Sequence, residues 1–177
     1  VDYEYFAKAK NIELYKCLSY SLTNKKDIEF IKKSNIDIVI LGGWQRLFSS
    51  QIISLINLVI IGQHGSSELL PRGRGRSPLS WSLVENRKRI VWNLFKIIDG
   101  VDNGPILDTQ SFDINHWDDI QTLYFKSSIV TKRMYLRVIP KLLEGSFQEK
   151  EQKGKSSFYR KFTPDDRKIN WHKSIYL

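Results

Sequence analysis

The chain has 177 residues, 41% of them hydrophobic, so it is long and apolar enough for one domain with a full core and lacks the composition of a disordered chain. Its formal net charge of +9 favours anionic partners such as nucleotide phosphates, RNA or acidic lipid, although a solvated lysine-rich surface would give the same composition. The single cysteine, Cys17, excludes an internal disulfide and fits a reducing compartment. No apolar run approaches the roughly 20 residues of a membrane span.

The first part of the chain alternates helical and extended segments. We expect helices over residues 2–10, 27–33 and 47–56, and strands over residues 12–17, 36–41 and 58–61. The run IDIVIL at 36–41 is nearly continuous and β-branched, which is typical of a strand buried on both faces, and Gly42-Gly43 ends it. The alternation predicts an α/β fold with a mostly parallel sheet flanked by helices.

The second part of the chain predicts a helix over 79–86, with Pro78 in its first turn, and strands over 89–98 and 106–114. The sequence DGVDNG at 99–104 is dense in turn residues and separates the two strands. The longest helical pattern runs from Asp118 to about Glu144. We expect Pro140 to kink or split this helix, Gly145 to end it, and TPDD at 163–166 to form a turn.

His64 is the first candidate for chemistry, because it follows the buried strand at 58–61 and begins a loop. Ligands usually bind at the carboxyl ends of the strands of an open α/β sheet, so its ring is expected to face that crevice. A histidine with an ordinary pKa near 6.5 can act as general base, general acid or hydrogen-bond donor at neutral pH. The alternative is a histidine that only hydrogen-bonds a loop carbonyl.

Asp102 and three arginines are the next candidates. Asp102 lies in the turn before Gly104 and can orient a histidine and stabilise its charged form, or it can simply cap its own backbone. Arg72, Arg74 and Arg76 alternate with glycines and suit a phosphate or carboxylate, or they form a solvated basic loop. Their spacing does not match a P-loop. Zinc-ligand, nucleophile-elbow and dinucleotide fingerprints are also missing, so we expect no metal site.

Three segments in this order resemble the folate-dependent formyltransferase family: HGSSELLPRGRGRSPLSW at 64–81, DGVDNGPILD at 99–108 and KFTPDDRKINW at 161–171. Methionyl-tRNA formyltransferase and the sugar N-formyltransferases belong to that family. The resemblance also extends to DIVILGGW at 37–44. It implies a Rossmann-like sheet that holds N10-formyltetrahydrofolate, the formyl donor, beside an amine acceptor.

The resemblance implies roles for particular residues, because the family's catalytic pattern is Asn-x-His followed later by Asp. His64 and Asp102 match the histidine and the aspartate. The positions that match the folate site are Ser66, Ser67, Leu69, Leu70, Pro71 and Gly43. Arg74, Arg76 and Trp81 are similar to the acceptor side of sugar N-formyltransferases.

Two departures from the family pattern stand out. Gly62 occupies the position of the asparagine, which would donate a hydrogen bond to the developing oxyanion; losing such a donor typically costs about 10²–10³ in rate. Gln63 could replace it only if the strand has ended or bulged at Gly62, because neighbours on a strand point to opposite faces. The loop after His64 is also about two residues longer than the family form, around Ser67-Glu68.

The expected organisation is a catalytic domain over residues 1–171 that lacks its first strand or strands, followed by the start of a truncated segment at 172–177. The expected reaction transfers a formyl group to the amine of a nucleotide-linked amino sugar, with methionyl-tRNA as the less favoured acceptor. A folate- or nucleotide-binding module without turnover and a basic RNA-binding domain are the alternatives. We expect a cytoplasmic protein without a membrane partner, and a homodimer is an open alternative.

Overall fold

The computed structural model describes residues 2–168, 171 and 172. The helices are α1 (Tyr3–Lys10), α2 (Lys25–Ser34), α3 (Ser50–Ile53), α4 (Pro78–Val84), α5 (Ile120–Leu143) and the 3₁₀ helix η1 (Pro164–Arg167). The strands are β1 (Ile38–Ile40), β2 (Val59–Ser66), β3 (Arg74–Gly75), β4 (Arg89–Lys96), β5 (Ile106–Asp113) and β6 (Phe158–Tyr159). The predicted α/β class is confirmed.

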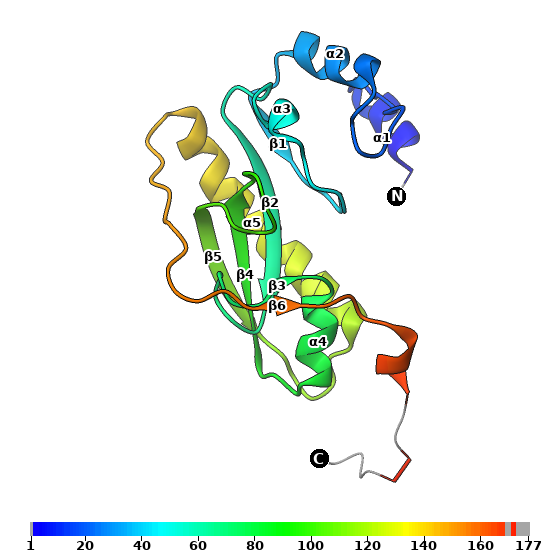
Figure 1. The fold of residues 1–177 in the computed structure, drawn as a ribbon, viewed down its shortest axis with the longest axis vertical. Helices are drawn as coiled ribbons and strands as arrows, with labels where there is room; N and C mark the ends of the chain where they lie inside the picture. Colours follow the sequence, from blue (N-terminus) through cyan, green and yellow to red (C-terminus); the bar gives the residue numbers. More distant parts are fainter. Residues whose placement is uncertain (1, 169–170, 173–177) are drawn as a thin grey trace.

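The main sheet has the strand order β1-β2-β4-β5, and β3 pairs with β6 in a second, two-stranded sheet (Figure 1). The β1–β2 pair is parallel, whereas β2–β4 and β4–β5 are antiparallel. The parallel share of the sheet is therefore smaller than predicted, because the short turn at 99–104 returns β5 beside β4 without a crossover helix.

Apolar side chains cover both faces of the sheet. On one face α5 packs against β2 and β4, and this core includes Ile61, Leu94, Leu123 and Met134. On the other face a smaller core of Leu70, Phe95 and Ile106 lies beneath the loop that follows β2. The candidate site lies on this second face.

β2 is longer than the expected strand, and α5 is one continuous helix. β2 runs eight residues, through His64 to Ser66, because each of its residues from Ile61 onward has a partner on β4. α5 continues to Leu143 although it contains Pro140, which lies in the last turn, where little of the helical ladder remains to be disrupted. The expectation that the strand ends before His64 was wrong. Pro140 was expected to kink or split the helix, and α5 is not split there.

The region before β2 contains less regular structure than expected. β1 is three residues long and only half-buried, with Ile40 exposed, so it is not buried on both faces. α3 covers four residues of the predicted helix at 47–56. Residues 12–17 form no strand, because this segment folds over α2 as an irregular loop.

Asp27 holds that loop in place. Its carboxylate is fully buried and accepts hydrogen bonds from the Tyr15 hydroxyl (2.8 Å) and from the backbone N–H groups of Leu18 (2.8 Å) and Ser19 (2.9 Å). Burial alone would raise the pKa of this carboxyl, but the hydrogen bonds outweigh it and hold the pKa below its ordinary value of 3.8.

We therefore expect Asp27 to make the free energy of unfolding depend on pH in the acidic range. The unfolded chain, with the higher pKa, binds the proton first, so the contribution of Asp27 is complete above about pH 4 and is lost as pH falls through the lowered pKa. Asp27→Asn should flatten the free energy of unfolding plotted against pH between about pH 2 and 5. Glu29 is exposed on the same helix, and its side chain makes no hydrogen bond with any described residue, so Glu29→Gln is the control. An unchanged slope in Asp27→Asn would contradict this prediction.

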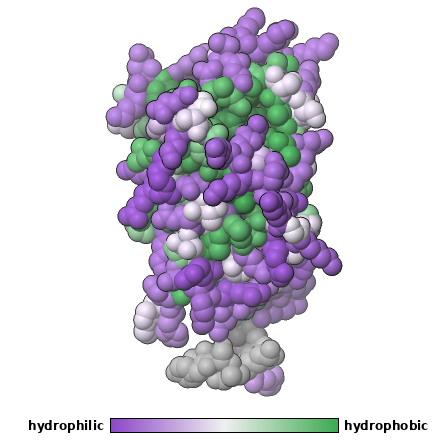
Figure 2. All heavy atoms as spheres, turned by 90° about the vertical axis from the view of Figure 1, so that its left-hand side faces the viewer, coloured by the Kyte–Doolittle hydropathy of each residue, from purple (hydrophilic) through white to green (hydrophobic). Residues whose placement is uncertain are grey.

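The side of the molecule that carries the free edge of β5 is mostly hydrophilic, with apolar groups in separate areas (Figure 2). Within the described residues, no helix combines the length and the apolarity that crossing a membrane requires.

Candidate functional site

β2 carries the candidate histidine on the sheet face opposite α5. Side chains alternate along a strand, so Gly62, His64 and Ser66 share one face, while Gln63 shares the other face with Ile61. The pairing of β2 with β4 continues in register through Ser66, without a bulge near Gly62. His64 therefore lies within a strand and beneath the loop that follows it, rather than at the beginning of that loop.

The His64 ring has an acceptor at each nitrogen. Nε2 lies 2.7 Å from the carbonyl oxygen of Gly73, and since a carbonyl only accepts, Nε2 carries a proton and donates it. Nδ1 lies 3.5 Å from Oδ2 of Asp102, a distance that allows an ion pair when the ring carries its second proton. The side chain of His64 is 6% exposed, so this pair is largely shielded from water.

The turn before β5 positions Asp102. Its backbone has φ 48°, in the left-handed region that aspartate tolerates better than most residues, and its Oδ2 also accepts from the Gly75 N–H (3.0 Å). Gly104 lies against the edge of β4, where an added Cβ would come within 1.8 Å of the Lys96 carbonyl oxygen. The predicted neighbourhood of His64 and Asp102 is thus present, and the backbone of residues 73–75 bridges the two side chains.

The Gln63 side chain lies on the opposite face of the sheet from His64. Its side-chain amide donates to the Leu41 carbonyl (3.1 Å), and its Oε1 accepts from the Thr131 hydroxyl of α5 (3.1 Å). The condition under which Gln63 could replace the family asparagine, a strand that ends or bulges at Gly62, is not met. Its side chain instead joins β1, β2 and α5 on the far face of the sheet.

The loop predicted to line the folate site is compact. The buried Ser66 hydroxyl donates to the Glu68 carbonyl (2.8 Å) and accepts from its N–H (3.2 Å), so the additional residues around Ser67-Glu68 form a local turn. Leu70 and Pro71 are buried, whereas Leu69 is exposed. This arrangement leaves the Ser67 hydroxyl, which has no hydrogen-bond partner among the described residues, the Leu69 side chain and the loop backbone as the groups available to a ligand.

Gly43 follows β1 with φ 86°, and no atom of the described residues lies within 4 Å of where its Cβ would be. The space beside it is therefore open.

The arginines of the loop have different surroundings. Arg72 pairs with Glu68 (2.9 Å), and Arg74 donates to the Gln152 side chain from Nη2 (2.6 Å) and lies over the Phe158 ring. Exposed Arg76 has no side-chain partner among the described residues. Arg76 is therefore the arginine of this loop that is free to bind an anion.

Trp81 packs against the C-terminal segment. Its ring stacks on Tyr159 (centroids 6.1 Å apart) and meets the edge of Phe162 (5.1 Å), and its Nε1 donates to the Arg160 carbonyl (2.9 Å). Among the described residues Trp81 makes no hydrogen bond or ring contact with His64 or Asp102. Its surroundings give Trp81 a packing role, and its acceptor role stays a prediction.

We expect Trp81→Ala to lower the free energy of unfolding by about 1–2 kcal/mol, less than the roughly 3–5 kcal/mol of a fully buried tryptophan, because the Trp81 side chain is only partly buried. Urea denaturation would measure the change. Trp117→Ala removes an indole that is 88% exposed and should change stability by less than about 0.5 kcal/mol. Unchanged stability of Trp81→Ala together with weaker acceptor binding would instead restore the substrate role.

Two residues of the site were missed from the sequence. Asn93 of β4 is fully buried directly across from His64, and its Oδ1 accepts from the Thr109 hydroxyl (2.9 Å). A polar residue inside the apolar run RIVWNLFK was the signal available for it. Gln152, which contacts the Asp102 turn, stands in a polar stretch and has no such signal.

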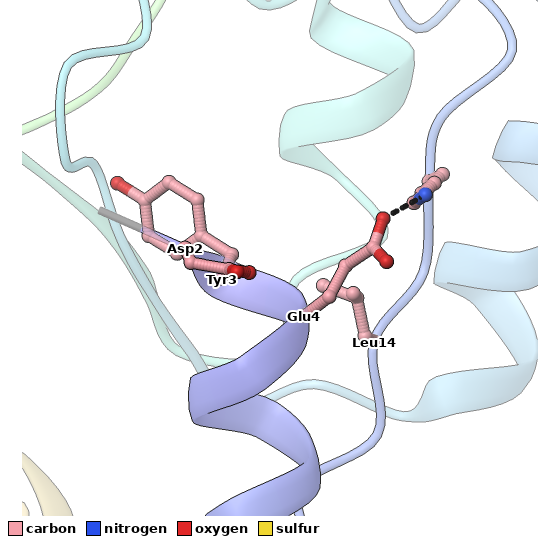
Figure 3. Close-up of a pocket in the computed structure, with 5 residues that line it drawn as sticks. Asp2, Tyr3, Glu4 and Leu14 are labelled. Atoms are coloured by element: carbon pink, nitrogen blue, oxygen red, sulfur yellow. Dashed lines mark ion pairs between the residues drawn. The ribbon is translucent and has the colours of Figure 1, made fainter.

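A hollow of about 370 Å³ lies elsewhere, between α1 and residues 14–16, well away from β3 and β6 (Figures 1 and 3). Asp2, Tyr3, Glu4 and Leu14 line it, and Glu4 forms an ion pair with Lys16. Its Glu4 is already paired with Lys16 and it lies away from His64, so it adds nothing to the site around His64.

The protein thus has an α/β fold and a shielded histidine–aspartate pair, an arrangement whose chemistry suits proton transfer. The formyl transferase family model matches residues 6–139, which is most of the chain. The chain therefore belongs to the formyl transferase family.

Similar proteins include the methionyl-tRNA formyltransferase of Thermodesulfovibrio yellowstonii, which is 32% identical over 152 residues, 84% of this chain and 49% of that protein. The structure of methionyl-tRNA formyltransferase from Clostridium thermocellum is similar at a TM-score of 0.69 and 22% identity, over 87% of this chain and 65% of that one. The formyltransferase PseJ from Anoxybacillus kamchatkensis, in complex with UDP-4,6-dideoxy-4-formamido-L-AltNAc and tetrahydrofolate, has a TM-score of 0.68 and 17% identity, over 94% of this chain and 85% of that one.

The chain spans about half the length of the curated methionyl-tRNA formyltransferases it matches. At these identities the two solved structures support the fold alone.

Proposed function

We propose that this chain transfers a formyl group from N10-formyltetrahydrofolate to the amine of a nucleotide-linked amino sugar, in the cytoplasm. The observation that carries the proposal is the His64–Asp102 pair, 3.5 Å apart on the second face of the sheet, in a chain of the formyl transferase family. The donor supplies the formyl group, and the protein's own residues supply position and proton transfer.

His64 would move the proton. In this role its Nε2–H would donate toward the negative charge that develops on the formyl oxygen, or the ring would carry the proton released by the attacking amine to the tetrahydrofolate nitrogen that leaves. Asp102 would keep the ring oriented and favour its charged form, as the third group of a triad does. Because Nε2 now donates to the Gly73 carbonyl, this mechanism requires Gly73 to release it when the substrates bind.

The loop and its surroundings fit a polar, heterocyclic ligand. Asn103 lies next to Asp102, and its Oδ1 is buried without a hydrogen-bond partner among the described residues, so it is available to accept from a ligand N–H. Ser67, exposed Leu69 and the open side of Gly43 would line the folate site with the loop backbone.

A nucleotide-linked sugar is the acceptor that we favour, because Arg76 offers a free guanidinium beside this loop for a diphosphate. PseJ, whose structure contains a UDP-linked formamido sugar, is similar over most of its own length. Methionyl-tRNA is the second candidate, supported by the 32% identical relative and the net charge of +9. A binding module that lacks turnover remains the alternative from another class, since Gly62 replaces the family asparagine.

The test is amine-dependent release of tetrahydrofolate from N10-formyltetrahydrofolate, measured with a panel of nucleotide-linked amino sugars and with methionyl-tRNA. Turnover with one sugar, lost in His64→Ala, is the expected result. Turnover with methionyl-tRNA alone would replace the proposed acceptor. Folate binding without any turnover would support the binding module.

A further inference from the structure

The segment that follows α5 is tied to both parts of the site. We call residues 148–160 the strap; it passes the free edge of β5 and crosses to β3 (Figure 1). Its Lys150 exchanges backbone hydrogen bonds with Ile106 (3.0 and 2.7 Å). Further along, the Ser157 hydroxyl accepts from the Gly73 N–H (2.9 Å), and its N–H donates to the Pro71 carbonyl (3.3 Å). The strap therefore links the loop over His64 to the turn that carries Asp102.

Gln152 makes this link with a single side chain. Its Nε2 donates to the carbonyl oxygens of Asp102 (2.8 Å) and Gly104 (2.7 Å). Its Oε1 accepts from Nη2 (2.6 Å) and Nε (3.3 Å) of Arg74. The side chain is half-buried, and both of its N–H groups and its oxygen are used.

These contacts restrain the turn that carries the Asp102 carboxylate. They fix two carbonyls of a turn whose Asp102 backbone is left-handed, and they fix Arg74, which precedes the Gly75 N–H that binds the same carboxylate. A small rotation of the turn would move Oδ2 away from Nδ1 of His64, which is already 3.5 Å away. Bonds from a third segment oppose that rotation.

We propose that Gln152 is a positioning residue for the His64–Asp102 pair. Its expected effect on turnover rests on the formyl-transfer function proposed above. Gln152 touches no reacting atom. It acts through the Asp102 turn, which it joins to the loop over His64.

Gln152→Glu tests the proposal. The carboxylate keeps an oxygen that accepts from Arg74, but it replaces the donating Nε2 by an oxygen that cannot donate to the two carbonyls of the turn. Gln152→Met, which removes all the polar contacts at similar size, is the second variant. Gln148→Glu introduces the same charge at an exposed strap position whose side chain makes no hydrogen bond in the described part of the chain, so it is the matched control. Urea unfolding would establish that each variant is folded.

The expected result in both Gln152 variants is a kcat about 10- to 100-fold lower with KM for the donor changed by less than about twofold, since misplacement of a catalytic group affects the chemical step. The ring ¹⁵N chemical shifts of His64, measured at pH 7 without substrate, should move toward those of Asp102→Asn and should stay unchanged in Gln148→Glu. A folded Gln152→Glu variant with wild-type His64 shifts would overturn the proposal. If the wild-type protein shows no turnover, the proposed function fails, and the ¹⁵N comparison still decides the role of Gln152.

Discussion

His64→Ala and Asp102→Asn should each lower the rate of formyl transfer at least about 100-fold, the usual contribution of a positioned acid or base. The two variants remove different things. His64→Ala removes the proton carrier, whereas Asp102→Asn keeps an oxygen that can accept from the Gly75 N–H but loses the negative charge facing Nδ1. Single-turnover kinetics with saturating donor and acceptor would separate this loss from weaker binding.

The control for this prediction is His116→Ala. His116 is exposed beyond the end of β5, where its ring meets Trp117, and its loss should leave the rate unchanged. Urea unfolding should show that both site variants remain folded. Near-normal turnover in His64→Ala and Asp102→Asn would remove the proposed roles of both residues.

The pairing of His64 with Asp102 could be predicted because each residue carries a local signal: a histidine directly after a buried apolar run, and an aspartate in a turn rich in glycine and asparagine. The resemblance of the two flanking segments to one family then placed them together. The long helix and the helix after Pro78 were also predictable, because their apolar periodicity and end signals are local.

What could not be predicted depends on contacts between distant parts of the chain. Residues 62–66 have no apolar pattern, and they belong to β2 because β4 satisfies their backbone groups. The sequence at residues 12–17 is typical of a strand, but this segment forms an irregular loop that is held by hydrogen bonds to Asp27. Trp81 stands in a segment that resembles an acceptor site, yet its partner Tyr159 is 78 residues away along the chain. The antiparallel return of β5, by contrast, follows from the local turn at 99–104, whose Gly104 lies against β4, and this part of the topology was open to prediction from the sequence.

Gly62→Asn, which restores the residue type of the family pattern, should by itself destabilise the protein and leave the rate of transfer low. A Cβ at position 62 would lie 2.6 Å from Cδ1 of Ile97 and 2.8 Å from Cζ of Phe95, so both side chains have to move. Phe95 packs with Leu70 under the loop of the site, and crowding this core should lower the free energy of unfolding by about 1–3 kcal/mol. Gly62→Ala, which adds the Cβ without the amide, should show a similar loss of stability.

The space beside Gly62 can be opened from the other side, by Phe95→Leu. If crowding is what excludes the asparagine, Gly62→Asn should be less destabilising in the Phe95→Leu background than in the wild type, a coupling that a double-mutant cycle measures. The amide would then be able to donate to the developing negative charge, and such a donor is worth about 10²–10³ in rate. We expect kcat of the double variant to exceed that of Phe95→Leu alone at least about tenfold, with Gly62→Ala/Phe95→Leu showing no gain. Equal turnover in the asparagine and alanine versions would mean that this chain obtains its oxyanion donor elsewhere in the site, and that Gly62 is compatible with catalysis as it stands.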